Sequence, residues 1–306
     1  MSDGITASSN DPEVARWASA WIGGMRLEPP VPLALRLRVS AGPLPEDADD
    51  RPPFVQPQLE IRSGPPQGDV RIRWVGAGAR ARIAAGARVA EVEVAVEALA
   101  DRERFGQSFL LIVLIFLLRR AGWHHVHASL ARDPRGRDWL FAGNAQSGKS
   151  TTAALLATWS WAVGSDDSAF LVRNGGAVDA VAQRAPIALR PSGHALLGLT
   201  GGTAARSGRK TAFFPEELGG SWVQRIEPRI LVFPRIEGAS TAVEPLQRRE
   251  ALAELVRWSA WVVLEPDLAQ DHLDLLTALA RQARAYRVAL APDLFHHRDL
   301  LLELVP

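Results

Sequence analysis

Nine consecutive residues have the pattern of a phosphate-binding loop. The segment GNAQSGKST satisfies G-x-x-x-x-G-K-[ST], follows an apolar run and precedes helix-forming residues. Backbone N–H groups and the helix N-terminus hold phosphate oxygens in such a loop. Lys149 would reach the β- and γ-phosphates, and Ser150 would give an oxygen to Mg²⁺. The predicted nucleotide-binding residues are Gly143, Asn144, Ala145, Gln146, Ser147, Gly148, Lys149, Ser150 and Thr151.

Two adjacent aspartates, Asp166 and Asp167, end the apolar segment WAVGSDD. Ligands of open α/β sheets bind at the C-terminal ends of strands. Phosphoryl transfer to a hydroxyl needs one group to hold Mg²⁺ and another to accept the alcohol proton. Ser-Asp-Asp is also good chemistry for a solvated turn. Beside a phosphate loop, the functional interpretation is favoured.

Two other apolar segments are candidates for the strand that ends in the acidic residue of a motor or switch NTPase. RILVFPR, residues 229–235, ends in proline and arginine. WVVLEPD carries Glu265 and Asp267, which fit a loop and helix cap equally well. Neither segment predicts that acid.

Lysine occurs at only two positions, Lys149 and Lys210, and arginine supplies every other basic side chain. A compact ammonium fits crowded phosphate sites better than the wide guanidinium fork. Residues 200–218 combine Gly, Ser and Thr with Arg206, Arg209 and Lys210. A mobile basic loop there would close over the transferred phosphoryl group; the alternative is a plain surface loop. Lys210 is included in the predicted nucleotide site.

The elements around these motifs alternate between helix and strand, which predicts an α/β sheet domain over residues 105–306. The expected helices span residues 106–120, 149–159, 249–258, 267–285 and 293–303. The expected strands span 124–131, 138–142, 161–164, 229–233, 261–264 and 286–291, with a hairpin over 168–182.

Residues 1–104 are predicted to form a smaller mixed α/β domain. A helix is expected over residues 11–24, where Trp17 and Trp21 lie on one face and are expected to pack on the protein's own core. Strands are expected at 31–41, 58–62 and 69–75, while residues 81–100 are compatible with strand or helix.

The segment HASLARDPRGRDWLFAGNAQSGKSTTAALLATWSWAVGSDDSAFL resembles the catalytic core of the HPr kinase/phosphorylase family, in particular its HPr-kinase-related branch. The resemblance is close over residues 124–173 and loose from there to the C-terminus. It implies a P-loop kinase domain of the HPr kinase C-terminal type.

The resemblance also implies roles for individual residues. Asp166 would be the base that takes the proton of an acceptor serine, Asp167 the metal-associated acid, and His127 the histidine that contacts the acidic pair. His124 and His125 compete for the histidine role, and strand alternation puts only His125 on the same face as His127.

The implied activity is ATP- and Mg²⁺-dependent transfer of the γ-phosphoryl group to a hydroxyl, on a serine of a peptide or small protein. Relatives in this branch include kinases of lasso-type precursor peptides. The Glu-Ile-Arg-Gly-Leu-Gly type segment of the phosphorylase members is missing here, which argues against the reverse reaction and against HPr as substrate. The alternatives are a small-molecule kinase on the same scaffold and a non-catalytic nucleotide-binding regulatory protein.

Composition narrows the class of partner. The net charge of +1 gives no electrostatic case for nucleic acid or a membrane surface. The absence of cysteine excludes disulfides and thiolate metal sites. The most apolar run, residues 109–118, is far shorter than the about 20 residues that a membrane-spanning helix needs. We expect a cytoplasmic protein, as a monomer or homo-oligomer.

Overall fold

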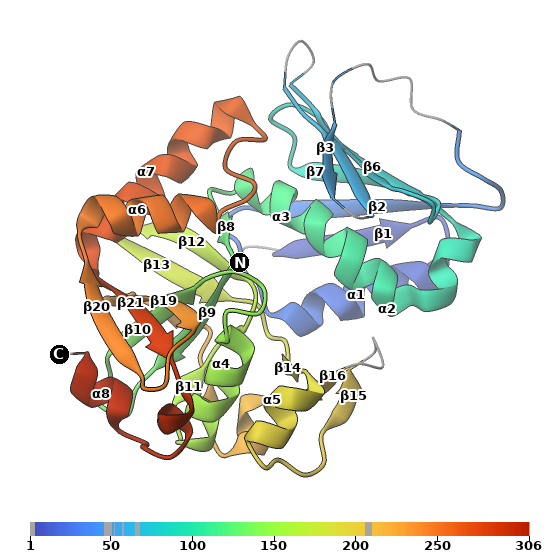
Figure 1. The fold of residues 1–306 in the computed structure, drawn as a ribbon. Coiled ribbons are helices and arrows are strands. Elements are labelled where there is room, and N and C mark those ends of the chain that lie inside the picture. The colour runs from blue at the N-terminus through green and yellow to red at the C-terminus, as the bar shows by residue number, and fades with distance from the viewer. Residues whose placement is uncertain are drawn as a thin grey trace. The chain divides into compact units, whose positions relative to one another are not determined.

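A computed structural model describes residues 4–45, 51, 53–56, 58–64, 68–205 and 210–305. The chain divides into two compact units, the first formed by Met1–His124 with Trp261–Asp271 and the second by His125–Ala260 with His272–Pro306. The expected boundary between residues 104 and 105 therefore falls inside the first unit. Both units contain helices and sheets, so the fold is mixed α/β, as expected (Figure 1).

The first unit is built on one seven-stranded sheet of order β1-β2-β7-β6-β5-β4-β3. Its strands are β1 (Ile5–Ser9), β2 (Leu33–Ser40), β3 (Phe54–Gln56), β4 (Leu59–Arg62), β5 (Val70–Trp74), β6 (Ala79–Ile83) and β7 (Val89–Ala95). Buried and solvent-facing side chains alternate along β2 and β4–β7, so one face of the sheet supplies the core.

Helices pack on that buried face. They are α1 (Pro12–Met25), a 3₁₀ turn (Val96–Asp101), α2 (Arg102–Phe105), a π-helical turn (Gly106–Leu110) and α3 (Leu111–Arg119). Asp11 caps α1 by accepting hydrogen bonds from the first-turn N–H groups. Trp17 stacks on Trp21 and its ring lies 5.9 Å from that of Phe105 at a tilt, which confirms that both tryptophans pack on the core of their own unit.

The second unit contains a seven-stranded sheet of order β17-β11-β9-β10-β19-β21-β20. Its strands are β9 (Ala128–Arg132), β10 (Asp138–Ala142), β11 (Ala162–Val163), β17 (Ser221–Trp222), β19 (Ile230–Ile236), β20 (Ala242–Leu246) and β21 (Arg284–Leu290). Smaller sheets are formed by β8 (His124–Val126), β12 (Ala169–Asn174), β13 (Ala177–Ala182) and β18 (Arg225–Ile226), and by β14 (Ile187–Leu189), β15 (Thr203–Ala205) and β16 (Lys210–Phe213).

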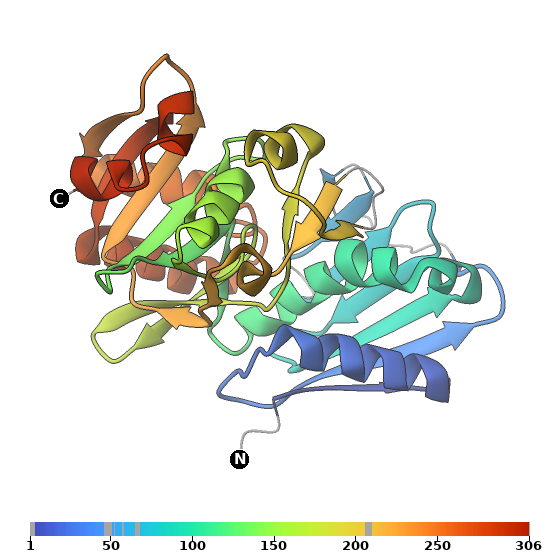
Figure 2. The same cartoon turned by 90° about the horizontal axis from the view of Figure 1, so that it is seen from below.

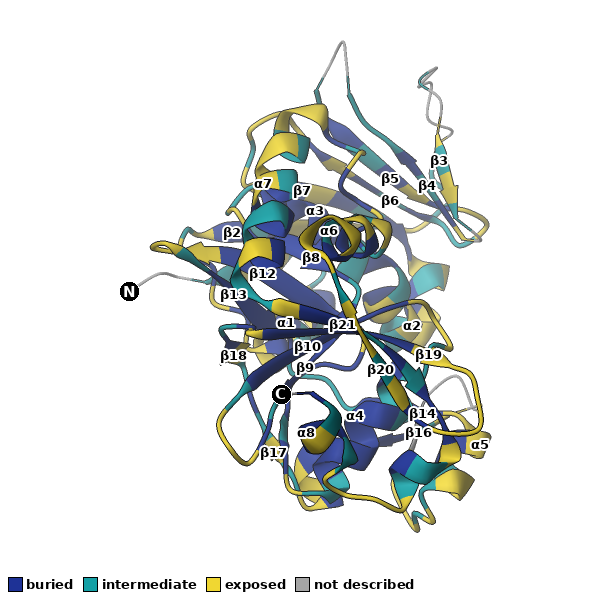
Figure 3. Ribbon diagram, turned by 60° about the vertical axis from the view of Figure 1, so that its left-hand side comes forward, coloured by how far each residue is buried: buried dark blue, intermediate teal, exposed yellow. Residues whose placement is uncertain are grey.

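The large sheet has a buried core on each face (Figure 3). Helix α4 (Lys149–Thr158) and α8 (Leu300–Leu304) cover one face, where Ala154 and Leu156 pack against strand side chains such as Phe141. Helices α6 (Arg248–Arg257) and α7 (Pro266–Gln282) and the β12–β13 hairpin supply the core on the other face. Figure 2 shows the same elements from below; α5 (Pro191–Leu196) and 3₁₀ turns at Pro215–Leu218 and Pro292–Phe295 complete the unit.

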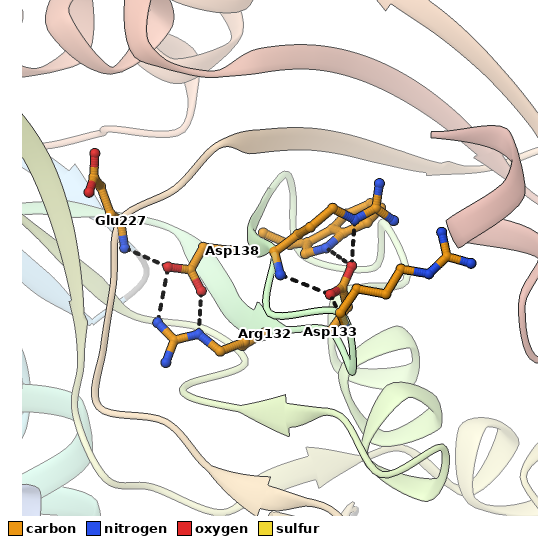
Figure 4. A network of polar contacts seen from close by, with 7 residues as sticks. Arg132, Asp133, Asp138 and Glu227 are labelled. Atoms are coloured by element: carbon orange, nitrogen blue, oxygen red, sulfur yellow. Dashed lines mark hydrogen bonds and ion pairs between the residues drawn. The ribbon is translucent and has the colours of Figure 1, made fainter. Parts of the chain in front are cut away.

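Two buried carboxylates fix the hairpin between β9 and β10 (Figure 4). Asp138 accepts hydrogen bonds from Arg132 Nε at 2.6 Å and Nη2 at 3.0 Å, and from the Glu227 backbone N–H at 2.9 Å. Asp133 accepts from the Arg137 backbone N–H at 2.9 Å and from its Nε at 2.7 Å. This network holds the start of β10, the strand whose other end carries the phosphate loop.

Several expected elements differ in the structure. Residues 261–264 form a turn and not a strand; the expected strand over 124–131 breaks at His127 into β8 and β9; and the expected helix over 293–303 is two short pieces. Residues 200–218, expected as a loop, contain β15, β16 and a 3₁₀ turn. Among the described residues, no helix combines the length and apolar character needed to cross a membrane.

Candidate functional site

The candidate phosphate loop, residues 143–151, and the aspartate pair leave the large sheet at the same edge. Strand β9 is antiparallel to both β10 and β11, so β10 and β11 run in the same direction. The loop follows β10 and Ser165-Asp166-Asp167 follows β11. Ser129 on β9 donates its hydroxyl to the Asp166 carbonyl at 3.0 Å, and this bond ties the acidic turn to the sheet. The two motifs therefore meet where ligands bind in open α/β sheets.

Backbone conformation and close packing explain why two positions of the loop are glycine. Gly148 precedes α4 with φ of +97°, and a Cβ there would lie 2.9 Å from Leu290 Cδ1. A Cβ on Gly143 would lie 2.8 Å from Ser147 Oγ. Gln146 has φ of +72°, a left-handed conformation that non-glycine residues rarely adopt. The loop is therefore held in a tight, locally strained turn.

The loop has the donors that a polyphosphate needs. Within the described part of the chain, the N–H groups of residues 144–146 and 148–151 donate to no backbone carbonyl. Ser147 Oγ is buried and has no hydrogen-bond partner among those residues. Unsatisfied donors at a helix N-terminus attract anions, so this cradle fits the phosphates of a nucleotide.

Lys149 lies inside the loop, and the residue is only 5% exposed. Its Nζ donates to the carbonyl oxygens of Gly143 at 2.7 Å and Asn144 at 2.8 Å. Burial lowers the pKa of Lys149 to about 8, while the charges of Asp167 and Asp166 act in the opposite direction. The ammonium group thus lies within the loop, bonded to two of its carbonyl oxygens.

Asp166 is a buried carboxyl group at this edge, 8% exposed. Burial, and then the neighbouring charge of Asp167, raise its pKa to about 6. The Ser150 hydroxyl, the Ala188 N–H at 3.3 Å from Oδ2 and the charge of Lys210 lower the pKa in part. A carboxyl group with a pKa close to neutrality is suited to accept a proton during a reaction.

Asp167 has the opposite environment, with 71% of its side chain exposed. Desolvation raises its pKa, but the hydrogen bond from His127 Nδ1 at 3.0 Å and the charges of His127 and Lys149 prevail and lower it to about 2. Solvent screens these interactions at so exposed a group. The two adjacent carboxyl groups therefore differ in pKa, and Asp167 is the more acidic one.

Of the three neighbouring histidines, His127 is the one that contacts the acidic pair. Its backbone N–H donates to the Trp258 carbonyl at 2.9 Å, outside any strand ladder, and this bond accompanies the break between β8 and β9. His125 is buried with its ring 5.8 Å from that of Phe170, and burial lowers its pKa to about 3. His124 is also buried, and burial lowers its pKa to about 4.

The second lysine also lies near the site, because the charge of Lys210 at the start of β16 acts on Asp166. Arg206 and Arg209, predicted to share this role, lie outside the described residues. Sequence reasoning missed Ala188 on β14, since a backbone donor leaves no side-chain signal. It also missed Ser165, whose Oγ accepts from the N–H groups of Asp167 and Ser168; a serine before Asp-Asp is typical of such turns.

Glu265 and Asp267 belong to the first unit and not to this site. Glu265 pairs with Arg120 and with Arg119 Nη1 at 3.4 Å. Over the residues described, no group of three or more His, Asp or Glu side chains is arranged to hold a metal ion. This does not argue against Mg²⁺ at the loop, because Mg²⁺ at a nucleotide site takes one or two protein oxygens together with phosphate oxygens and water.

Among the described residues, the site thus joins a loop of unpaired N–H groups, a buried ammonium, a carboxyl group of raised pKa and a second carboxyl group of lowered pKa at one sheet edge. Comparison with family models and with curated proteins gives no match to this sequence. The function is therefore argued from the site itself.

Proposed function

We propose that this protein is an ATP- and Mg²⁺-dependent kinase that transfers the γ-phosphoryl group to a hydroxyl of a peptide or small protein. The observation that carries the proposal is the buried Asp166, with a pKa raised to about 6, at the same sheet edge as the phosphate loop. Carboxyl groups whose pKa is raised by burial gather at catalytic sites, which favours transfer chemistry over binding alone.

The loop amides and Lys149 would hold the triphosphate and neutralise charge that develops on the transferred group. Ser150 and Asp167 would hold Mg²⁺, which would supply positive charge to neutralise the phosphate groups. In the transfer, the acceptor oxygen forms a bond to the γ-phosphorus, the bond from that phosphorus to the leaving ADP oxygen breaks, and the acceptor proton passes to Asp166. Lys210 would add positive charge on the acceptor side.

The acceptor class and the kinase family rest on the resemblance to the HPr-kinase-related branch. The order of His127, the phosphate loop and the Asp-Asp pair carries that resemblance. It supports a P-loop kinase domain and a serine acceptor, with lasso-type precursor peptides as one substrate class. On this proposal the protein works in the cytoplasm, where ATP is available.

The test is transfer from ATP labelled at the γ-phosphate to peptides encoded beside the gene, followed by mass spectrometry. We expect a phosphorylated hydroxyl, and we expect Asp166→Asn to lower transfer by about 10²- to 10⁴-fold with ATP binding retained. Asp299→Asn is the matched control, because Asp299 is exposed and makes no capping hydrogen bond. Full transfer by Asp166→Asn would overturn the mechanism; ATP binding without any product would favour a regulatory protein.

One contact favours the opposite assignment, in which Asp166 is the metal-associated acid and Asp167 is the base. A hydrogen bond from the Ser150 hydroxyl lowers the pKa of Asp166, so the loop oxygen that would bind Mg²⁺ interacts with Asp166. Comparing Asp166→Asn with Asp167→Asn distinguishes the assignments. The variant that loses the metal-associated acid should need more Mg²⁺ for half-maximal rate, and the variant that loses the base should lose rate at any Mg²⁺ concentration.

A further inference from the structure

The solvent-facing side of the sheet in the first unit carries a dense array of arginines. The helices cover the other side, where Trp74 stacks on Phe105 and Phe109. Strand register aligns the solvent-facing residues in two rows across β2, β7, β6, β5 and β4. The first row is Arg36, Glu91, Arg82, Arg71 and Arg62; the second is Arg38, Glu93, Arg80, Arg73 and Glu60. We call these ten residues the arginine face.

This arrangement costs stability, because like charges directly opposite each other on neighbouring strands repel. Arg82, Arg71 and Arg62 are consecutive cross-strand neighbours, and Arg80 lies opposite Arg73. The fold offsets part of the repulsion with one buried acid: Asp69 is 1% exposed and receives Arg82 Nε at 2.8 Å and Arg71 Nε at 3.2 Å. A protein with a net charge of only +1 thus concentrates positive charge on one sheet face.

Other arginines of the face are available to a partner. Among the residues that the structure describes, the side chains of Arg38 and Arg73 are exposed and make no hydrogen bond or ion pair. Arg36 is paired with Glu91 at 3.1 Å, but 61% of its side chain is exposed. Guanidinium groups bind carboxylates and phosphates through two parallel hydrogen bonds, so exposed arginines in fixed register suit an anionic ligand.

We propose that the arginine face docks an acidic peptide segment of a partner protein. The described strands that form it place no aromatic side chain on this side, so it lacks the stacking groups that bind single-stranded nucleic acid. Glu60, Glu91 and Glu93 interrupt the rows and would repel a continuous phosphate backbone, whereas separate carboxylates can pair with individual arginines. The inference does not depend on phosphoryl transfer at the nucleotide site.

The experiment measures fluorescence anisotropy of labelled decaglutamate with the full chain at low salt. We expect binding that weakens with added salt, and an affinity about tenfold lower for Arg38→Gln/Arg73→Gln, since each exposed pair contributes about fivefold or less. Arg38→Lys/Arg73→Lys should recover part of the loss. The matched control is Arg16→Gln/Arg173→Gln, which removes two exposed arginines elsewhere and should bind like the parent protein.

Three results would overturn the proposal. The first is equal affinity for the Arg38/Arg73 variant and its control, and the second is tighter binding of labelled decauridylate than of decaglutamate, which would indicate a nucleic-acid surface. The third concerns the chain's own acids Glu46, Asp47, Asp49 and Asp50, whose placement lies outside the described residues. If neutralising these four acids abolishes the difference between the Arg38/Arg73 variant and the parent, the arginines serve that segment and not a partner.

Discussion

Asp166 and Asp167 are neighbours in sequence but differ sharply in environment. The first side chain is enclosed and receives N–H and hydroxyl donors, whereas the second projects into solvent and pairs with His127. Burial raises the pKa of Asp166 to about 6, whereas the hydrogen bond and charge of His127 lower the pKa of Asp167 to about 2. Two titratable groups with pKa values driven apart can divide the roles of proton acceptor and fixed charge. Measurements on these single residues therefore test the proposed chemistry most directly.

The first prediction at this scale is a bell-shaped pH profile. Asp166 must be ionised to accept a proton, so kcat/KM for ATP should rise with pH through about 6, the raised pKa of that group. Lys149 must be protonated to bind phosphate, so the same parameter should fall as pH passes its lowered pKa of about 8. Initial rates at low ATP give the profile. Binding of ATP measured alone should show only the alkaline limb, and an acidic limb near pH 4 would contradict the assignment.

The second residue-scale prediction concerns stability. The folded-state pKa of Asp166, about 6, exceeds the ordinary aspartate value of 3.8, so between those pH values the folded state binds more protons and stability falls as pH rises. Above pH 6 the ionised carboxylate destabilises the fold by about 1 to 3 kcal/mol. Asp166→Asn should therefore raise the melting temperature at pH 8 and lose that advantage below pH 4. Thermal unfolding at both pH values tests this, and an unchanged melting temperature at pH 8 would refute it.

At the scale of elements, the turn before α4 determines whether the loop can form. Gly148→Ala would place a Cβ in a left-handed conformation and 2.9 Å from Leu290 Cδ1. We expect a loss of about 2 kcal/mol in unfolding free energy, combining backbone strain and overpacking, and loss of ATP binding. Gly175→Ala is the control, because Gly175 has φ of +56° with no atom within 4 Å of a Cβ. Calorimetric ATP titration should show that only the control still binds.

Several helices and strands, and both motifs of the candidate site, could be predicted from the sequence. The helix expected over residues 11–24 is α1, because Asp11 caps it and its apolar residues recur at helical spacing. Both site motifs were predictable because each is contiguous and follows an apolar strand. The apolar run at 261–264 was wrongly predicted to be a strand. Trp261 and Val262 are buried but form no strand ladder, and Val263 is 70% exposed. Tertiary packing overrides strand propensity there.

The long-range parts of the site were not predictable. The Ala188 N–H and the charge of Lys210 reach Asp166 only after β14 and β16 pair, and pairing between distant segments leaves no local pattern. His127 likewise stands at a strand break accompanied by a hydrogen bond to Trp258, a contact over more than a hundred residues. Sequence spacing indicated which residues are candidates for the site, and only the fold showed how their environments differ.

At the scale of the whole molecule, the first unit is assembled from two separate pieces of chain. Residues 261–271 complete it: the Trp261 ring lies 5.6 Å from that of Phe116, and its carbonyl accepts from Arg119 Nη1 at 2.5 Å. Glu265 supplies the negative charge beside Arg119, whose side chain is fully buried, and Arg120. Its pKa is raised by burial, although both arginines act against that shift. The ion cluster thus links distant parts of the sequence within the first unit.

Glu265→Gln should therefore destabilise the first unit selectively. Removing the carboxylate leaves Arg119 and Arg120 as buried charges without compensation, which costs about 3 kcal/mol or more. Hydrogen exchange should accelerate in α3 and remain nearly unchanged in α4, because the latter lies in the other unit. Glu303→Gln removes an exposed carboxylate that pairs with His297 and should change neither helix. Equal acceleration of α3 and α4 would mean that the two units unfold as one cooperative body, and the division of the chain would then have no energetic counterpart.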